Sequence, residues 1–235
     1  STSVGGIREA LKDPNRTMLG REQEDWLADN LRGSVNDGVR WQILAQGVIM
    51  GKRRFPSTVA DWFGSGGMIS LDENDPTELD RRARYLKRLT QLDLPYALDK
   101  WDGYPAARSR LYESIRASEA ETIVLSGDSH NSWAFDLFHE GERLAVEMST
   151  TSVSSFGFEK VIAGNLPRAE HDFVDENPEL VWCDLSRRGY LDLNLRPNTV
   201  ESEWRFIPSR RLKTTWLESR ERFVVERGSR QLTRN

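Results

Sequence analysis

A short polar segment, Asp128-Ser129-His130-Asn131, brings together residue types that are well suited to chemistry. It follows the β-branched run 121–126, which is typical of a buried strand. In open α/β sheets, ligands bind just beyond the carboxyl ends of the strands. Carboxylate and imidazole groups at such a place are natural ligands for first-row metal ions. The segment is therefore the first candidate for a functional site.

The spacing within this segment favours a shared metal. Asp128 and His130 are two residues apart, so in an extended stretch both side chains point to the same side. Gly127, directly before them, allows the backbone to approach a ligand closely. Asn131 adds an amide that could bind substrate. We therefore expect Asp128 and His130 to be metal ligands and catalytic residues, with Asn131 beside them.

Two other interpretations of the same residues stay open on spacing alone. An Asp-x-His sequence after a strand is more often a turn or a capping element than a metal site. Alternatively, Asp128 and His130 could activate Ser129 as a nucleophile. The sequence has no Gly-x-Ser-x-Gly elbow, and neighbours this close in sequence rarely form such a relay, so this alternative is the weakest.

The first half of the chain alternates helical patterns with apolar runs. Such alternation predicts an α/β fold in which at least some strands are parallel. The segment 52–75, rich in Gly, Ser, Pro and Asp, reads as a long loop at the rim of a site. The expected elements are helices over 20–31, 76–92 and from 105 onward, and buried strands over 41–50 and 121–126.

The second half is richer in strands. Residues 132–138 and 143–148 are predicted to form a hairpin around the turn 139–142. Further strands are expected over 180–184, 190–196 and 200–207. Together these patterns predict a layered α/β/α fold around a mixed sheet with an antiparallel edge.

Composition excludes some classes of protein. The chain has 235 residues, 37% of them hydrophobic and 30% charged, with a formal charge of -4. This balance lacks the basic excess of a nucleic-acid-binding protein, so nucleic acid is not expected as the main partner. No run of about 18 apolar residues is present, so no membrane span is predicted. The charged tail 205–234 is expected to be a solvated amphipathic helix or strand.

Several other residues have plain structural interpretations. The single cysteine, Cys183, lies in an apolar run and is expected to be buried in a strand. His139, in the predicted turn, and His171, in a polar run, are expected to face solvent. Residues 64–67, Gly-Ser-Gly-Gly, lack the Lys-Ser/Thr that follows a phosphate-binding loop, which argues against such a loop here.

A set of short blocks, in order along residues 10 to 210, resembles PhoD-type phosphatases. Each block is weak alone, whereas the ordered set is specific. The blocks are Arg16-Thr17-Met18-Leu19-Gly20-x-x-Gln23-x-x-Trp26-Leu27, Trp41-Gln42-Ile43-Leu44-Ala45-Gln46, Trp101-Asp102-Gly103-Tyr104-Pro105-Ala106-Ala107-Arg108, Val124-Leu125-Ser126-Gly127-Asp128-Ser129-His130, Trp133-Ala134-Phe135-Asp136-Leu137, Thr151-Ser152-Val153-Ser154-Ser155 and Arg188-Gly189-Tyr190.

This resemblance implies a metallophosphoesterase-like α/β sandwich that hydrolyses phosphate esters with calcium and iron. It implies that His130 coordinates metal and that Asp128 ligates or orients it. Arg108 could clamp a phosphate, because a guanidinium fork fits two of its oxygens, although pairing with a carboxylate is the commoner role for such an arginine. The resemblance also suggests a periplasmic or extracellular location.

The chain departs from the family pattern in what it lacks. The remaining family ligands lie in an N-terminal half that has no counterpart here, including a strand-end Cys and a Gly-Asp-x-x-Tyr motif. The resemblance therefore implies that residues 1–235 are the C-terminal part of a PhoD-like domain, completed by a missing half or by a second polypeptide. An inactive domain that binds metal or phosphate is the alternative.

Overall fold

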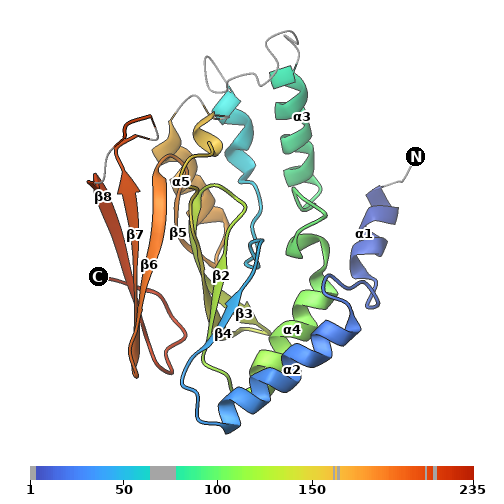
Figure 1. Ribbon diagram of the computed structural model, residues 1–235. Coiled ribbons are helices and arrows are strands. Elements are labelled where there is room, and N and C mark those ends of the chain that lie inside the picture. The colour runs from blue at the N-terminus through green and yellow to red at the C-terminus, as the bar shows by residue number, and fades with distance from the viewer. Residues whose placement is uncertain (1–3, 64–77, 161, 163–164, 210, 214–215) are drawn as a thin grey trace.

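Two sheets and a set of helices form three layers in the computed structural model (Figure 1). The structure describes residues 4–63, 78–160, 162, 165–209, 211–213 and 216–235. Its α-helices are α1 (Val4–Lys12), α2 (Arg21–Asn36), α3 (Glu78–Gln91), α4 (Pro105–Ser118) and α5 (Leu166–Glu176), with 3₁₀ turns η1 (Ser57–Phe63), η2 (Trp101–Gly103) and η3 (Phe158–Lys160). Its strands are β1 (Gln42–Ala45), β2 (Thr122–Ser126), β3 (Ser132–His139), β4 (Glu142–Ser149), β5 (Leu180–Asp184), β6 (Arg188–Leu195), β7 (Thr199–Ile207), β8 (Ser219–Glu226) and β9 (Thr233–Arg234).

The first sheet is mixed, with the strand order β1-β2-β4-β3-β5. Strands β1, β2 and β4 run parallel, and β3 runs antiparallel to both of its neighbours. The hairpin between β3 and β4 turns at Glu140 and Gly141, whose φ angles of 51° and 85° suit a two-residue turn that needs left-handed residues. The α/β class and the mixed sheet are as predicted.

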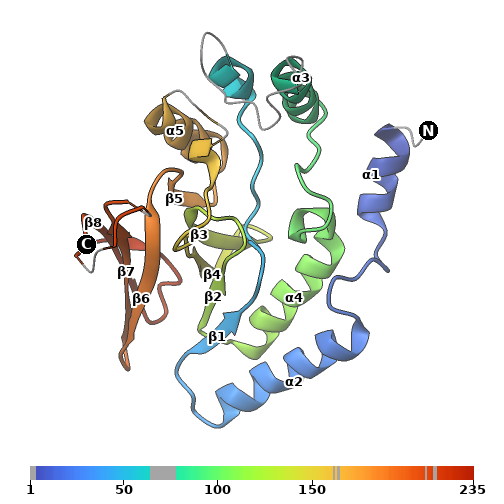
Figure 2. The ribbon, with the colours of Figure 1, turned by 45° about the horizontal axis from the view of Figure 1, so that its top comes forward.

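Helices cover one face of this sheet and the second sheet covers the other (Figure 2). On β3, Trp133, Phe135 and Leu137 point into the core beneath the helices, whereas Ala134 points toward the second sheet. Because both faces of the strand are covered, apolar residues occupy neighbouring positions of β3 rather than alternate ones, with Asp136 as the interruption.

The second sheet is antiparallel, in the order β6-β7-β8-β9. Its inner face packs through an aromatic cluster in which the ring centroids of Trp182 and Trp204 lie 5.1 Å apart and those of Trp204 and Phe223 lie 5.8 Å apart. The layer on this side of the first sheet is therefore a sheet rather than the expected helices. The strands β6 and β7 are joined by residues 196–198 alone, and such a short connection favours antiparallel pairing.

The predicted strand over 41–50 is wrong in its length and burial. β1 spans only Gln42–Ala45 and lies at the edge of the sheet, with Ile43 exposed. Beyond it, the backbone N–H groups of Met50 and Gly51 donate to the carboxylate of Glu147 at 2.8 and 2.7 Å. An apolar segment can leave a sheet when another group satisfies its backbone donors, as this carboxylate does.

Two other boundaries differ from the prediction. The helix expected over 20–31 continues to Asn36 as α2, through Gly33 and Ser34. The tail 205–234 forms the end of β7 together with β8 and β9, which confirms the strand alternative. Of the long loop expected over 52–75, the described part contains η1, while the Gly-Ser-Gly-Gly sequence at 64–67 lies outside the described residues. No described helix has both the length and the apolar character to cross a membrane.

Candidate functional site

The parallel strands place the candidate segment where a site is expected. β1, β2 and β4 run in one direction, so their carboxyl ends meet at one edge of the sheet. Residues 127–131 follow β2, and residues 150–157 follow β4 at the same edge. The hydroxyl of Thr151 donates to the carbonyl oxygen of Arg187 at 2.9 Å. Arg187 directly precedes β6, so this bond connects the loop after β4 to the start of β6.

The backbone of the segment is a tight turn, contrary to the extended stretch predicted from spacing. Asp128 and His130 have φ angles of 60° and 59°, in the left-handed region that non-glycine residues seldom adopt. Such conformations concentrate at functional sites because the surrounding structure must hold them. The segment is thus a turn, as one of the interpretations from the sequence expected. A turn of this kind does not argue against metal ligands at Asp128 and His130.

Asp128 is held in its charged form by a nearby cation. Its carboxylate lies 2.7 Å from the ammonium nitrogen of Lys100, and its side chain is about half exposed. The hydrogen bond from Lys100 lowers the pKa of Asp128, and the nearby charges of His130 and Arg53 act in the same direction. An ionised, accessible carboxylate is the form that binds a cation.

His130 is oriented by one ring nitrogen, which leaves the other for a ligand. Its Nδ1 lies 3.0 Å from the carbonyl oxygen of Phe156, and the residue is exposed. A metal-ligating histidine commonly fixes its tautomer through such a bond to a backbone carbonyl. The carbonyl oxygen of His130 also accepts a hydrogen bond from Arg188, so both ends of this residue are positioned.

Ser129 does not occupy the position of a nucleophile. Its hydroxyl accepts a hydrogen bond from the indole nitrogen of Trp133 at 2.9 Å and donates one to the carbonyl oxygen of Asn131, also at 2.9 Å. Both contacts stabilise the turn, and neither His130 nor Asp128 is among the hydrogen-bond partners of the hydroxyl. This arrangement argues against the relay considered from the sequence.

Asn131 lies behind the turn rather than on its surface. Its side chain is fully buried, and its Oδ1 accepts a hydrogen bond from the backbone N–H of Phe158 at 3.1 Å. A Cβ added at Gly157 would lie 2.6 Å from the amide, so only glycine fits there. Asn131 thus joins the two loops of the site, and its predicted contact with substrate stays a prediction.

Arg108 is buried and paired, as the alternative interpretation of this residue expected. Its Nη1 donates to the carboxylate of Asp102 at 2.8 Å and to the carbonyl oxygen of Met50 at 2.9 Å. Desolvation lowers the pKa of Arg108, but the charge of Asp102 and other contacts outweigh it and leave the pKa raised. Arg108 therefore supports the segment around Met50, and a phosphate clamp by Arg108 stays an untested prediction.

Asp128 and His130 lie in one turn after β2, and their role as metal ligands stays a prediction. Within the described ranges, no group of three or more His, Cys, Asp or Glu residues is arranged to hold a metal ion. His171 is exposed, as predicted, beside Asp175. His139 lies at the end of β3 with only 13% of its side chain exposed, packed on the ring of Tyr112, so the expectation that it faces solvent is wrong. Cys183 is buried in β5, as expected.

Residues missed by the sequence analysis also shape the site. Lys100 pairs with Asp128, and Arg188 holds the carbonyl of His130 although it lies 58 residues away in sequence. Arg53 places its guanidinium carbon 4.6 Å from the ring centroid of Trp133. The family resemblance of the block 188–190 could have drawn attention to Arg188. No local sequence pattern identifies Lys100 or Arg53 as site residues.

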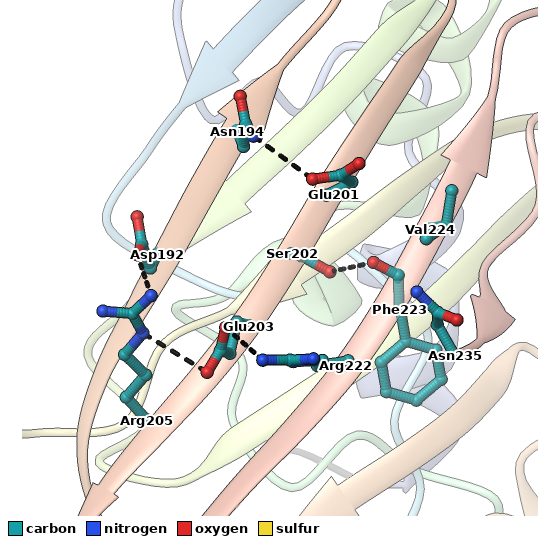
Figure 3. A pocket seen from close by; sticks show the side chains of 10 residues that line it. All are labelled: Asp192, Asn194, Glu201, Ser202, Glu203, Arg205, Arg222, Phe223, Val224 and Asn235. Carbon is teal, nitrogen blue, oxygen red and sulfur yellow. Dashed lines mark hydrogen bonds and ion pairs between the residues drawn. The ribbon is translucent and has the colours of Figure 1, made fainter. Parts of the chain in front are cut away.

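A separate hollow of about 340 Å³ lies on the outer face of the second sheet (Figure 3). Its central residue, Glu203, lies 3.3 to 3.4 Å from Arg205, Arg220 and Arg222, and Arg205 also pairs with Asp192 at 2.7 Å. Cross-strand pairs of opposite charge stabilise exposed sheet faces. The charges in this hollow thus largely satisfy one another, which favours a structural role.

Comparison with known proteins agrees with this picture. The chain is 29% identical over 204 residues to alkaline phosphatase D of Bacillus subtilis (strain 168), which covers 84% of this chain and 28% of the relative. A solved structure of PhoD superposes with a TM-score of 0.67 at 26% identity, covering 95% of this chain and 36% of the other. The chain thus spans about a third of the length of these relatives. The family model for PhoD-like phosphatases matches residues 3–204, so the chain belongs to the PhoD-like phosphatase family.

Proposed function

We propose that residues 1–235 are the C-terminal part of a metal-dependent phosphoesterase domain that hydrolyses phosphate esters. The observation that carries this proposal is the turn after β2, which holds an ionised Asp128 and an oriented His130 at the carboxyl edge of the sheet. Family membership supplies the reaction class, phosphate ester hydrolysis. A periplasmic or extracellular location is part of the same proposal and rests on the resemblance.

In this proposal, Asp128 and His130 supply two ligands of a metal centre, with calcium and iron as the expected metals. A bound metal would neutralise phosphate oxygens and lower the pKa of a bound water. Lys100 keeps Asp128 ionised, and the carbonyl of Phe156 engages Nδ1 of His130, which makes Nε2 the proposed ligand atom. Arg188 fixes the backbone directly after His130 through the carbonyl of that residue.

A missing half would complete both the ligand set and the sheet. β1 pairs with β2 on one side only, so its other edge has no neighbour in the described sheet. An open strand edge accepts a further strand through backbone hydrogen bonds. We therefore propose that the N-terminal half, or a second polypeptide, adds strands along β1 and brings the remaining ligands to the same carboxyl edge.

Metal binding at this corner is tested by adding Mn²⁺ to the purified chain and following the histidine ring signals by NMR. Because Asp128 and His130 lie two residues apart in one turn, the signals of His130 are expected to broaden at lower Mn²⁺ concentrations than those of His139 and His171. The exposed pair His171 and Asp175 is the internal control, since it also combines an imidazole with a carboxylate. Equal broadening of all three rings would contradict the proposed site.

Activity gives a second test. Residues 1–235 alone are expected to hydrolyse p-nitrophenyl phosphate at the rate of the buffer blank, since two ligands do not complete a two-metal site. Co-expression with the N-terminal half is expected to restore turnover, and His130→Ala in the complex should abolish it. Strong turnover by the isolated chain, lost on His130→Ala, would show that the chain is complete. Metal binding without turnover in the complex would favour the alternative of an inactive binding domain.

A further inference from the structure

We propose that Arg53 and Lys100 form a small anion-binding site beside Asp128 that receives an oxygen of the substrate's phosphoryl group. This inference rests on the proposed function for the identity of the anion, and it assigns the substrate-binding role to residues that no motif of the chain marks. The pocket lies between the segment after β1 and the loop before η2, and its lining includes Gly51, Arg53, Tyr96, Lys100 and Asp102. Its volume of about 20 Å³ suits a single oxygen atom, so the rest of the phosphoryl group would lie at its mouth.

The side chain of Arg53 has an unused donor at this place. Its guanidinium lies against the ring of the fully buried Trp133. Its Nη1 is buried and has no hydrogen-bond acceptor among the described residues. Buried donors in folded proteins are nearly always paired, so this nitrogen would be satisfied by a water or by a ligand oxygen in the adjoining pocket.

The nearby carboxylate does not neutralise Arg53. One oxygen of Asp102 accepts a hydrogen bond from Arg108 at 2.8 Å, and the other accepts one from the backbone N–H of Arg53 at 3.1 Å. Burial lowers the pKa of Arg53, with the charge of Asp102 acting in the opposite direction. The guanidinium is therefore a poorly solvated cation, and an anion would stabilise it.

Lys100 connects this pocket to the proposed metal corner. Lys100 is one of the lining residues, and its ammonium lies 2.7 Å from the carboxylate of Asp128. A phosphoryl group between Arg53 and Lys100 would thus stand next to Asp128, where the proposed chemistry takes place. The planar guanidinium can bind two phosphate oxygens at once, and the ammonium adds a point charge.

The backbone holds Arg53 in place before any ligand arrives. The carboxylate of Glu147 accepts the N–H groups of Met50 and Gly51, and Arg108 donates to the carbonyl oxygen of Met50. These contacts, with the bond from Arg53 N–H to Asp102, fix the segment 50–53 on both sides. A pre-ordered donor loses less freedom on binding, which favours a binding role over a passive one.

The test is a calorimetric titration of the chain with inorganic phosphate at pH 7.5 in EDTA, so that no metal contributes. Saturable binding is expected, weakened at least tenfold by Arg53→Met and by Lys100→Gln. Arg53→Lys should retain part of the affinity, because it keeps the charge but loses the fork. Lys52→Met is the control, since Lys52 is adjacent, largely exposed and paired with Glu179 at 3.4 Å.

Thermal melting of each variant shows whether it is folded. If Arg53→Met does not fold, Lys100→Gln decides the outcome, because this side chain is at the surface end of the pocket. Absence of phosphate binding by the unmodified chain, or equal affinity in Lys100→Gln and Lys52→Met, would overturn the inference. A parallel titration with phenyl phosphate is expected to give comparable affinity and the same ranking of variants, which distinguishes an ester site from a site for free phosphate only.

The outcome is separable from that of the proposed metal site. Phosphate binding that depends on Arg53 and Lys100, with no preference of Mn²⁺ for His130, would support the pocket and contradict the metal centre. Preferential broadening of the His130 signals by Mn²⁺, without phosphate binding, would support the metal centre and contradict the anion-binding site.

Discussion

Replacing Arg188 by methionine is expected to lower the free energy of unfolding by about 3 kcal/mol, since the buried guanidinium is lost while the partly buried Glu159 and the other oxygens that it contacts lose their partner. The side chain of Arg188 is 5% exposed and pairs with Glu159. Its Nη1 also donates to the carbonyl oxygen of His130 and to the hydroxyl of Thr151. Urea unfolding at pH 7.5 measures the change.

Arg196→Met is the matched control for this substitution. Arg196 also pairs with a glutamate, Glu201 at 3.2 Å, but both side chains are about half exposed. An exposed pair contributes about 0 to 1 kcal/mol, so the control should be nearly neutral. If Arg188→Met and Arg196→Met had the same effect, Arg188 would not join the loops of the site. Glu159 also accepts a hydrogen bond from the N–H of Gly157. Loss of the Arg188 side chain should therefore also increase the mobility of residues 157–159.

Replacing Glu147 by glutamine is expected to remove a pH dependence of stability worth about 3 kcal/mol, from a pKa difference of about 2.5 units. Burial raises the pKa of Glu147 from 4.5 to about 7, although backbone N–H groups of Met50 and Gly51 oppose the shift. Between pH 4.5 and 7 the folded protein keeps a proton that the unfolded chain releases. This stabilisation is therefore complete below pH 4.5 and is lost as the pH rises to 7.

The measurement is urea unfolding at pH 4.5 and 7.5 for the original chain and for Glu147→Gln. Glutamine keeps one oxygen for the N–H groups but does not titrate, so the difference between the two pH values should shrink by about 3 kcal/mol. Glu142→Gln, on the exposed end of the same strand, should leave the difference unchanged. An unaltered pH dependence in Glu147→Gln would show that this carboxyl does not titrate in that range.

The elements most accessible from the sequence are those whose local pattern agrees with their surroundings. The apolar residues of β2 and β3 stand at neighbouring positions because a helix layer and a sheet cover the two faces, and these elements were predicted as strands. The run over 41–50 looked similar, yet only its first part is a strand. Glu147 satisfies the N–H of Met50 from 97 positions away, and no local pattern reveals such a contact.

The candidate site shows the same difference between residues with a local sequence pattern and residues brought together only by folding. Asp128 and His130 were found because their residue types, spacing and family block coincide. Their left-handed backbone was missed, because spacing alone does not specify the φ angles that the contacts with Phe156 and Arg188 maintain. Arg53 and Lys100 lie in irregular segments without periodicity, and only the folded chain brings both next to Asp128.

The contact between the two sheets bears on where this protein can be trimmed. The family match ends at residue 204, within β7, whereas Phe223 and Val225 of β8 lie in the core between the sheets. The N–H of Leu232 donates to the carboxylate of Asp136 on β3 at 2.9 Å, so the last residues return to the first sheet. An expression clone cut at the family boundary would expose Trp204 and one face of β4 to water. A clone designed from the fold would instead retain the chain through Arg234.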